Sequence, residues 1–183
     1  MNVWDKKRDI MRRYDVTAQI YDRRYAEEQT AKIEAALEQV KVDAGMILDV
    51  GCGTGILFNY VADKARMTVG LDFSKETLLV AKERAKNHAS VHLVRADADN
   101  VPLRDKVFDR VFAMTLIQNT PKPNKTLDEI RRVVKDNGLI VVTGLKKVFK
   151  RSTVKQLLRN AGLNNMIVGN EGLKCYVAVC TKL

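Results

Sequence analysis

The feature that most constrains this 183-residue chain is an apolar run that ends in three closely spaced glycines. Residues 46–50 read MILDV, and residues 51–55 read GCGTG. An apolar run of this length suits a strand that is buried on both faces of a sheet. Glycine permits positive φ angles and the close approach of a ligand to the main chain. The pattern therefore predicts a buried parallel strand followed by a ligand-binding turn.

The rest of the chain alternates between strand-like and helix-like segments. Further strands are expected at 67–72, 90–97, 108–115, 139–144, 166–170 and 173–183. Helices are expected at 1–13, 16–40, 55–65, 74–88, 126–138 and 153–162. Ser74 is placed to cap its helix at the N-terminus, and Gly138 and Gly162 are placed to end theirs.

This order of elements predicts an α/β fold. Alternating strands and helices form a doubly wound, mostly parallel sheet with helices on both faces. The last two strands lack room for a crossover helix, so they should pair as a hairpin that adds one antiparallel strand to a seven-stranded sheet. The chain is expected to form one domain, 1–183, in which residues 1–40 make an N-terminal helical cap segment.

The amino-acid composition limits the cellular location and the binding partners that we expect. Thirty-two Lys and Arg against 22 Asp and Glu give a net charge of +10, which favours a polyanion such as nucleic acid or reflects a lysine-rich solvated surface. Three cysteines without metal-ligand spacing favour reduced core thiols, no metal and a cytoplasmic location. No stretch reaches the roughly 18–20 apolar residues of a membrane span, and the N-terminus lacks the apolar region of a signal peptide.

The spacing of the glycines separates two classes of nucleotide cofactor. In open parallel sheets, ligands bind beyond the carboxyl ends of the strands. A dinucleotide site favours G-x-G-x-x-G, whereas Gly51, Gly53 and Gly55 form G-x-G-x-G, and Ile56 stands where the third glycine is wanted. An acid, Asp49, lies inside the strand two residues before the first glycine.

The segment Asp-Val-Gly-Cys-Gly-Thr-Gly, residues 49–55, resembles the signature of class I, type 11-like, S-adenosylmethionine (SAM) dependent methyltransferases. The order of elements and the terminal antiparallel strand resemble the same family. The resemblance implies an enzyme with SAM as its cofactor. Residues 128–143, DEIRRVVKDNGLIVVT, are similar to the subfamily that includes quinone and other small-molecule methyltransferases.

The resemblance also implies a set of cofactor-binding residues. Asp72 would accept hydrogen bonds from both ribose hydroxyls, and Asp97 would accept from the adenine amino group beside the Ala98 N–H. Phe73 either packs on adenine or belongs to the core, and Asp99 is expected in a solvated loop. The remaining members of the expected set are Asp49, Gly51, Cys52, Gly53, Thr54, Gly55 and Met114.

The N-terminal segment 14–25 resembles the stretch that many of these enzymes fold over the cofactor. Tyr14 and Tyr21 lie seven residues apart and therefore share one face of a helix. One of them contacts the methionine end of SAM, or both pack the helix onto the sheet.

The acceptor site is expected after the fourth strand. The Asn/Asp-Pro-Pro-aromatic motif of many nucleobase amino-methyltransferases is missing, because residues 114–117 read MTLI. Asn119 and Gln118 follow as candidate catalytic residues that hold the acceptor; the alternative is a plain helix-capping turn.

Two basic clusters suggest the substrate. Lys6, Lys7, Arg8, Arg12 and Arg13 begin the N-terminal segment, and Lys146, Lys147, Lys150 and Arg151 follow the fifth strand. They form either a track for RNA phosphates or two unrelated solvated faces. Phe149 could stack on a base or serve as a buried anchor.

The connection after the fifth strand is short, which predicts an open site suited to a large substrate. We therefore expect a monomeric enzyme that methylates a base nitrogen in RNA, with ribosomal RNA the first target. The layout is similar to short archaeal methyltransferases of ribosomal RNA, including cytosine amino groups. The alternatives are a small-molecule methyltransferase and a non-catalytic RNA-binding subunit with the same fold.

Overall fold

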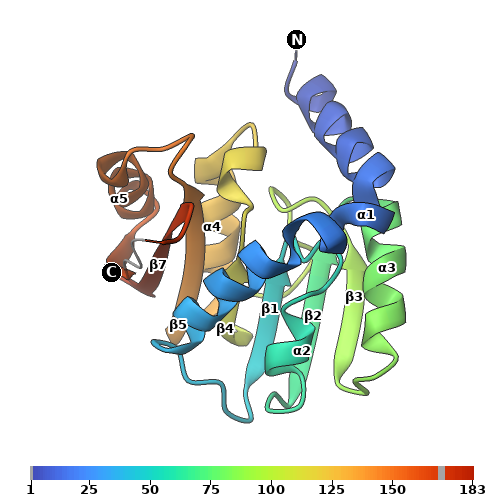
Figure 1. Cartoon of the computed structure of the whole chain (residues 1–183). Coiled ribbons are helices and arrows are strands. Elements are labelled where there is room, and N and C mark those ends of the chain that lie inside the picture. Colours follow the sequence, from blue (N-terminus) through green and yellow to red (C-terminus); the bar gives the residue numbers. More distant parts are fainter. Residues whose placement is uncertain (1, 169–171) are drawn as a thin grey trace.

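The computed structural model describes residues 2–168 and 172–183. Within these residues, seven strands form one sheet in the order β3-β2-β1-β4-β5-β7-β6 (Figure 1). β7 is antiparallel to both of its neighbours, and every other pair is parallel. The expected fold class is confirmed. The strands are β1 (Met46–Val50), β2 (Met67–Asp72), β3 (Val91–Arg95), β4 (Phe108–Ala113), β5 (Val134–Leu145), β6 (Leu163–Val168) and β7 (Cys175–Lys182).

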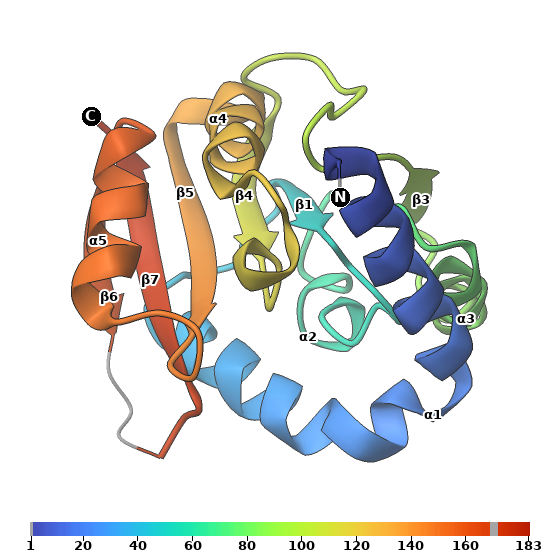
Figure 2. The same cartoon turned by 90° about the horizontal axis from the view of Figure 1, so that it is seen from above.

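Helices cover both faces of the sheet, as Figures 1 and 2 show. Ile130 of α4 and Leu158 of α5 belong to the same core cluster as Leu48 of β1. On the opposite face, Ile33 of α1 packs with Ile47, the neighbour of Leu48 in the same strand. Neighbouring residues of β1 point to opposite faces of the sheet, so α4 and α5 lie on one face and the second half of α1 lies on the other. The helices are α1 (Val3–Leu37), α2 (Phe58–Val61), α3 (Lys75–Ala85), the 3₁₀ helix η1 (Ile117–Asn119), α4 (Pro123–Val133) and α5 (Arg151–Asn160).

The N-terminal cap is one helix rather than the two that the sequence predicted. α1 runs through the expected break at residues 14–15 because no glycine or proline interrupts Val3–Leu37. Asn2 and Asp5 form a capping box at its start. The helix bends around the carboxyl ends of the strands (Figure 2). Met1, which the first predicted helix included, lies outside the described residues.

Several other boundaries differ from the prediction. The helix expected at 55–65 is reduced to α2, and the 96–107 connection between β3 and β4 contains no helix. Gly138 does not cap α4, because the register between β4 and β5 jumps from Phe108–Val134 to Arg110–Leu139 and Gly138 lies inside β5. The predicted strand 166–170 begins earlier, at Leu163, and its residues 169 and 170 lie outside the described residues.

All three cysteines are free and buried. Cys175 and Cys180 lie in different core clusters, on opposite faces of β7, as their odd spacing predicted. Within 2–168 and 172–183, no helix is long and apolar enough to cross a membrane. The same residues contain no group of three His, Cys, Asp or Glu side chains placed to hold a metal ion.

The ring of Phe58 supports the glycine turn from below. Phe58 is fully buried, and a Cβ added at either Gly55 or Gly70 would overlap its ring. We expect Phe58→Ala to lower the free energy of unfolding by about 3–5 kcal/mol because it leaves a cavity between β1, β2 and α3. Urea denaturation measures this loss. The exposed neighbour Asn59 provides the control, since Asn59→Ala should change stability by no more than about 0.5 kcal/mol.

Candidate active site

The glycine turn lies where the order of the strands reverses. β1 pairs with β2 on one side and with β4 on the other, so the connections that leave β1 and β4 diverge at their carboxyl ends. Such a switch point is the usual place for a ligand crevice in an open α/β sheet. A cavity opens there, with about 730 Å³ of empty space when the open solvent at its mouth is included. It is bounded by Gly51 and Gly53, by the ends of β2, β3 and β4, and by α1.

The three motif glycines all have positive φ, but their surroundings differ. Gly53 (φ 54°) has open space where a Cβ would be, so its main chain is exposed to a ligand. At Gly51 (φ 74°) a Cβ would lie 2.9 Å from Leu116, and at Gly55 (φ 76°) it would meet Phe58. Gly51 and Gly53 line the cavity, whereas Gly55 shapes the turn through packing.

Asp72 ends β2 with each carboxylate oxygen held by one main-chain N–H. Gly53 donates to Oδ2 and Ser74 donates to Oδ1, both at 2.9 Å. Burial raises the pKa of Asp72, and these two hydrogen bonds oppose the shift. Each oxygen keeps a further lone pair, so the carboxylate can accept from two hydroxyls at once. Phe73 lines the same cavity.

Asp49 lies beneath the turn on the face of β1 that α1 covers. Only 3% of the residue is exposed. Burial, together with the charge of Asp72, raises the pKa of Asp49 to about 8. It lines a smaller second cavity that shares Gly51 and Gly53 with the first. A cation bound there would favour the ionised form of Asp49 and lower this pKa. Two other predicted residues, Cys52 and Thr54, line this second cavity.

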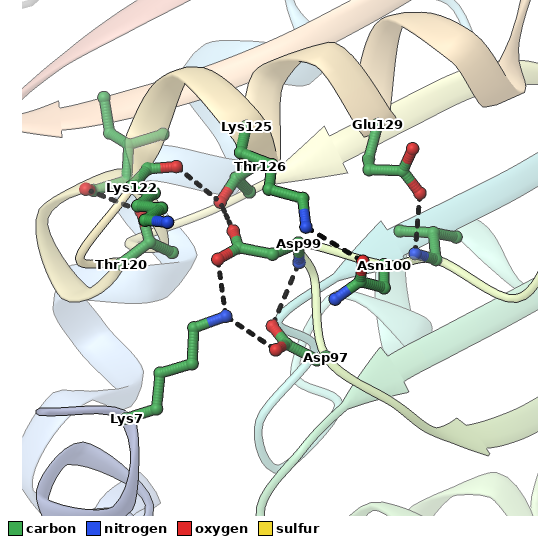
Figure 3. A network of polar contacts seen from close by, with 11 residues as sticks. Lys7, Asp97, Asp99, Asn100, Thr120, Lys122, Lys125, Thr126 and Glu129 are labelled. Atoms are coloured by element: carbon green, nitrogen blue, oxygen red, sulfur yellow. Dashed lines mark hydrogen bonds and ion pairs between the residues drawn. The ribbon is translucent and has the colours of Figure 1, made fainter. Parts of the chain in front are cut away.

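Asp97 and Ala98 line the cavity after β3, as the sequence predicted, but Asp99 is not solvated. Asp99 is 2% exposed and accepts a hydrogen bond from Thr126. The Lys7 ammonium lies 2.6 Å from Asp97 and 2.5 Å from Asp99 (Figure 3). Burial lowers the pKa of Lys7, but its hydrogen bonds to the two carboxylates outweigh this effect and leave the pKa above its usual range.

Tyr14 and Tyr21 share one face of α1 and both line the cavity. Their ring centroids are 6.1 Å apart. The Tyr14 hydroxyl accepts from Asn119 at 2.9 Å, and the Tyr21 hydroxyl accepts from Gln29 at 3.1 Å. Burial raises the pKa of both phenols, so they stay protonated at neutral pH.

The two candidate catalytic residues, Asn119 and Gln118, both lie in η1 after β4, but only one of them reaches the cavity. Asn119 lines the cavity, and its amide also donates to the Thr115 carbonyl at 2.8 Å. Gln118 does not line the cavity; its Oε1 is buried without a hydrogen-bond partner among the described residues. Consecutive residues of η1 point in different directions, so only Asn119 stays a candidate contact. Met114 lines both cavities.

Thr115 is a site residue that sequence reasoning missed. It is β-branched and yet has φ 57°, a strained conformation for such a residue. Its N–H donates to Thr143 at 2.7 Å, and its hydroxyl accepts from Gln29 and Lys32 at 3.1 and 3.2 Å. No local sequence signal marks this geometry, because its partners come from β5 and α1. The other missed lining residues are Ile10, Leu71, Thr77, Ala96, Leu116, Thr120 and Pro121.

The basic residues divide into one inward-facing and several outward-facing side chains. Lys7 is 8% exposed and ion-paired, so the expectation that it contacts RNA does not fit the structure. Arg13 is exposed and donates to Asn119 at 3.1 Å. Phe149 packs partly buried against the core, as an anchor would. The other exposed members of the two clusters are Lys6, Arg8, Arg12, Lys146, Lys147, Lys150 and Arg151.

The strand order, the glycine turn and the acid at the end of β2 define a nucleotide-binding α/β domain. A family model described as a methyltransferase domain matches residues 48–142, and the chain belongs to this family. The matched segment contains β2 to β4 and most of β1 and β5, which together build the crevice floor.

Relatives and a solved structure agree with this assignment. The chain is 33% identical over 144 residues to a malonyl-[acyl-carrier protein] O-methyltransferase of Marinomonas sp., covering 77% of this chain and 53% of the relative. It is 39% identical over 97 residues to a demethylmenaquinone methyltransferase of Staphylococcus haemolyticus, covering 51% and 41%. The chain thus spans about half the length of these relatives. The crystal structure of a SAM dependent methyltransferase from Aquifex aeolicus has the same fold, with a TM-score of 0.81 at 20% identity over 92% and 98% of the two chains.

The family and the fold imply SAM as the cofactor, and the residues of the crevice fit it. The open space at Gly53 admits a ligand to the main chain. Asp72 offers acceptors for two ribose hydroxyls, and the buried Asp49 suits the ammonium of a methionine moiety. Adenine would lie beside Phe73, Asp97 and Ala98, which line the other end of the larger cavity.

The assigned role of Asp72 leads to a direct test. We expect Asp72→Ala to weaken SAM binding by roughly 1–3 kcal/mol, about 5- to 150-fold in Kd, because two charged hydrogen bonds are lost. Isothermal titration calorimetry measures the change. Asp128 lies exposed on the outside of α4, and Asp128→Ala should leave the affinity unchanged. An equal affinity for both variants would refute the role of Asp72.

Asp49 should make stability depend on pH. Its pKa is about 8 in the folded protein against an ordinary value of 3.8, so between these pH values the folded state holds a proton that the unfolded state has lost. Stability from this group therefore falls as pH rises from about 4 to 8, by at most about 1.4 kcal/mol per pH unit. We expect Asp49→Asn to remove this slope. The difference between urea denaturation of both proteins at pH 5 and pH 8 measures it, and parallel pH profiles would contradict the assignment.

Proposed function

We propose that this chain transfers a methyl group from SAM to a nitrogen of an RNA base, with ribosomal RNA as the first target to test. The single observation that supports RNA is the position of the exposed basic residues. One group lies on α1, the helix that borders the crevice, and the other follows β5. β5 is parallel to β4, so its carboxyl end lies at the same edge of the sheet as the crevice.

SAM, when bound, supplies an electrophilic methyl group on a sulfonium. The protein then has to orient the acceptor and exclude water, which are its main means of acceleration. Apart from the ion-paired Lys7, the residues that line the cavity beyond the proposed adenosine contacts are uncharged; they include Ile10, Tyr14, Asn119 and Pro121. An acceptor with its own lone pair, such as an amino group or a ring nitrogen, suits such a lining because no proton must be removed before attack. Asn119 is placed to hold that acceptor.

A small-molecule acceptor is the second candidate, and the relatives favour it. Those compared above are named for malonyl-[acyl-carrier protein] and demethylmenaquinone. The exposed Arg13 beside Asn119 would suit an anionic group at the cavity mouth. On this alternative, the basic clusters are solvated surface without a partner.

Salt dependence separates the two acceptor classes. If the basic groups contact phosphates, RNA binding should weaken steeply with added salt. Neutralising the four residues of the β5 cluster, Lys146, Lys147, Lys150 and Arg151, to Gln should lower the slope of log K against log [salt] by up to about 3, at roughly 0.7 to 0.9 per phosphate contact. Fluorescence anisotropy with a ribosomal RNA fragment measures the slope.

The matched control removes the same charge from the opposite edge of the sheet. Lys41, Lys64, Arg66 and Lys86 are exposed and precede β1, β2 and β3 at their amino ends. Their joint change to Gln should leave the slope unchanged. Equal slopes for both quadruple variants, or no RNA affinity at low salt, would reject RNA. Transfer of labelled methyl from SAM to metabolite extracts but not to RNA would then support the small-molecule candidate.

A further inference from the structure

The N-terminal half of α1 is held on the domain by polar contacts rather than by the apolar core. Between Val3 and Ala26, the buried residues of the helix are Lys7 and Ala18. Apart from Ala18, the buried apolar residues of α1, such as Ile33 and Ala36, lie in its second half. A segment with so little apolar burial opens at a lower free energy than the core does. In Figure 1 this half of the helix extends beyond the edge of the sheet.

The ion-paired cluster of Lys7, Asp97 and Asp99 ties this half to the crevice. Lys7 lies in the second turn of α1, 90 residues before Asp97 in the sequence. Its ammonium bridges the two carboxylates, and Thr126 of α4 donates to the second oxygen of Asp99 (Figure 3). Asp97 also accepts from the Asp99 N–H at 3.0 Å. One cation therefore fixes two acids that would otherwise repel each other in a buried setting.

The cluster lies at the wall of the cavity. Lys7, Ile10 and Tyr14 from α1 line one side, and Asp72 and Asp97 from the strand ends line another. A ligand between them is enclosed while Lys7 keeps its partners. Removing the ammonium leaves the buried Asp99 and the partly buried Asp97 without a counter-charge, which is unfavourable. Asp15 and Asp22 also hold this half of α1, through Ser74 and Thr54, but of these contacts only that of Lys7 joins closure of the helix to the placement of Asp97.

We propose that Lys7 is a positioning residue of the cofactor site: it holds Asp97 in place and keeps the N-terminal half of α1 closed over the adenosine end of the crevice. This inference rests on the proposed binding of SAM. On this proposal, separation of Lys7 from the two acids limits the rate at which the cofactor, or its demethylated product, dissociates. The residue acts through Asp97 and α1 and takes no part in methyl transfer.

The dissociation rate of SAM tests the role of Lys7. Stopped-flow competition with an excess of unlabelled ligand should show dissociation from Lys7→Gln at least tenfold faster than from the wild type. Lys7→Arg, which keeps the charge, should recover most of the difference. Arg24 is exposed on the same helix, and Arg24→Gln controls for the loss of one positive charge. A rate unchanged in Lys7→Gln would overturn the inference.

Hydrogen exchange of wild-type amides 5–12 gives a second readout that needs no variant. We expect these amides to exchange several-fold more slowly when SAM is bound, because the closed helix covers the ligand. The same amides should lose that protection in Lys7→Gln, while amides of β4 stay protected. Equal exchange with and without SAM in the wild type would overturn the inference even if Lys7→Gln does not fold. Failure of the wild type to bind SAM at all would instead reject the proposed function and this inference with it.

Discussion

The hydrogen bond from the Gly53 N–H to Asp72 is the interaction on which the site depends. It joins the turn after β1 to the end of β2 at 2.9 Å, so that main-chain donors and a carboxylate face the same crevice. The bond requires a positive φ at Gly53 and a buried acid at the end of β2. The surrounding structure supports both: Phe58 fills the space below the turn, and Ser74 fixes the other oxygen of Asp72. A buried carboxylate that borders a crevice, with a pKa raised by burial, is typical of a ligand-binding site.

The fold was predictable because its signals are local and periodic. The apolar run before Gly51 marked β1, the alternation of elements marked the parallel sheet, and the short spacing of the last two strands marked β7 as antiparallel. The positions of two cavity-lining acids followed from the same strand ends, since Asp72 ends β2 and Asp97 lies two residues after the end of β3. Where the prediction was wrong, at Gly138, a change of register between β4 and β5 decided the structure, and register depends on pairing rather than on local sequence.

The contact between Lys7 of α1 and the acids after β3 could not be predicted from the sequence. The sequence marked Lys7 as one member of a basic cluster and Asp99 as a solvated acid; the structure pairs them in the interior. The bend of α1 brings the second turn of the helix to the end of β3. Neither segment contains a sequence pattern that predicts this contact. The sequence also could not show which of Asn119 and Gln118 reaches the cavity, because η1 is too short to have a periodic pattern.

Thr115 carries a consequence for how the site is assembled. A β-branched residue at positive φ costs of order 1–3 kcal/mol unless its surroundings impose that conformation. Its hydroxyl partners, Gln29 and Lys32, belong to the docked half of α1. The Thr115 N–H is also held by Thr143 of β5, so the wall of the crevice after β4 takes its shape jointly from the sheet and from the docked half of α1.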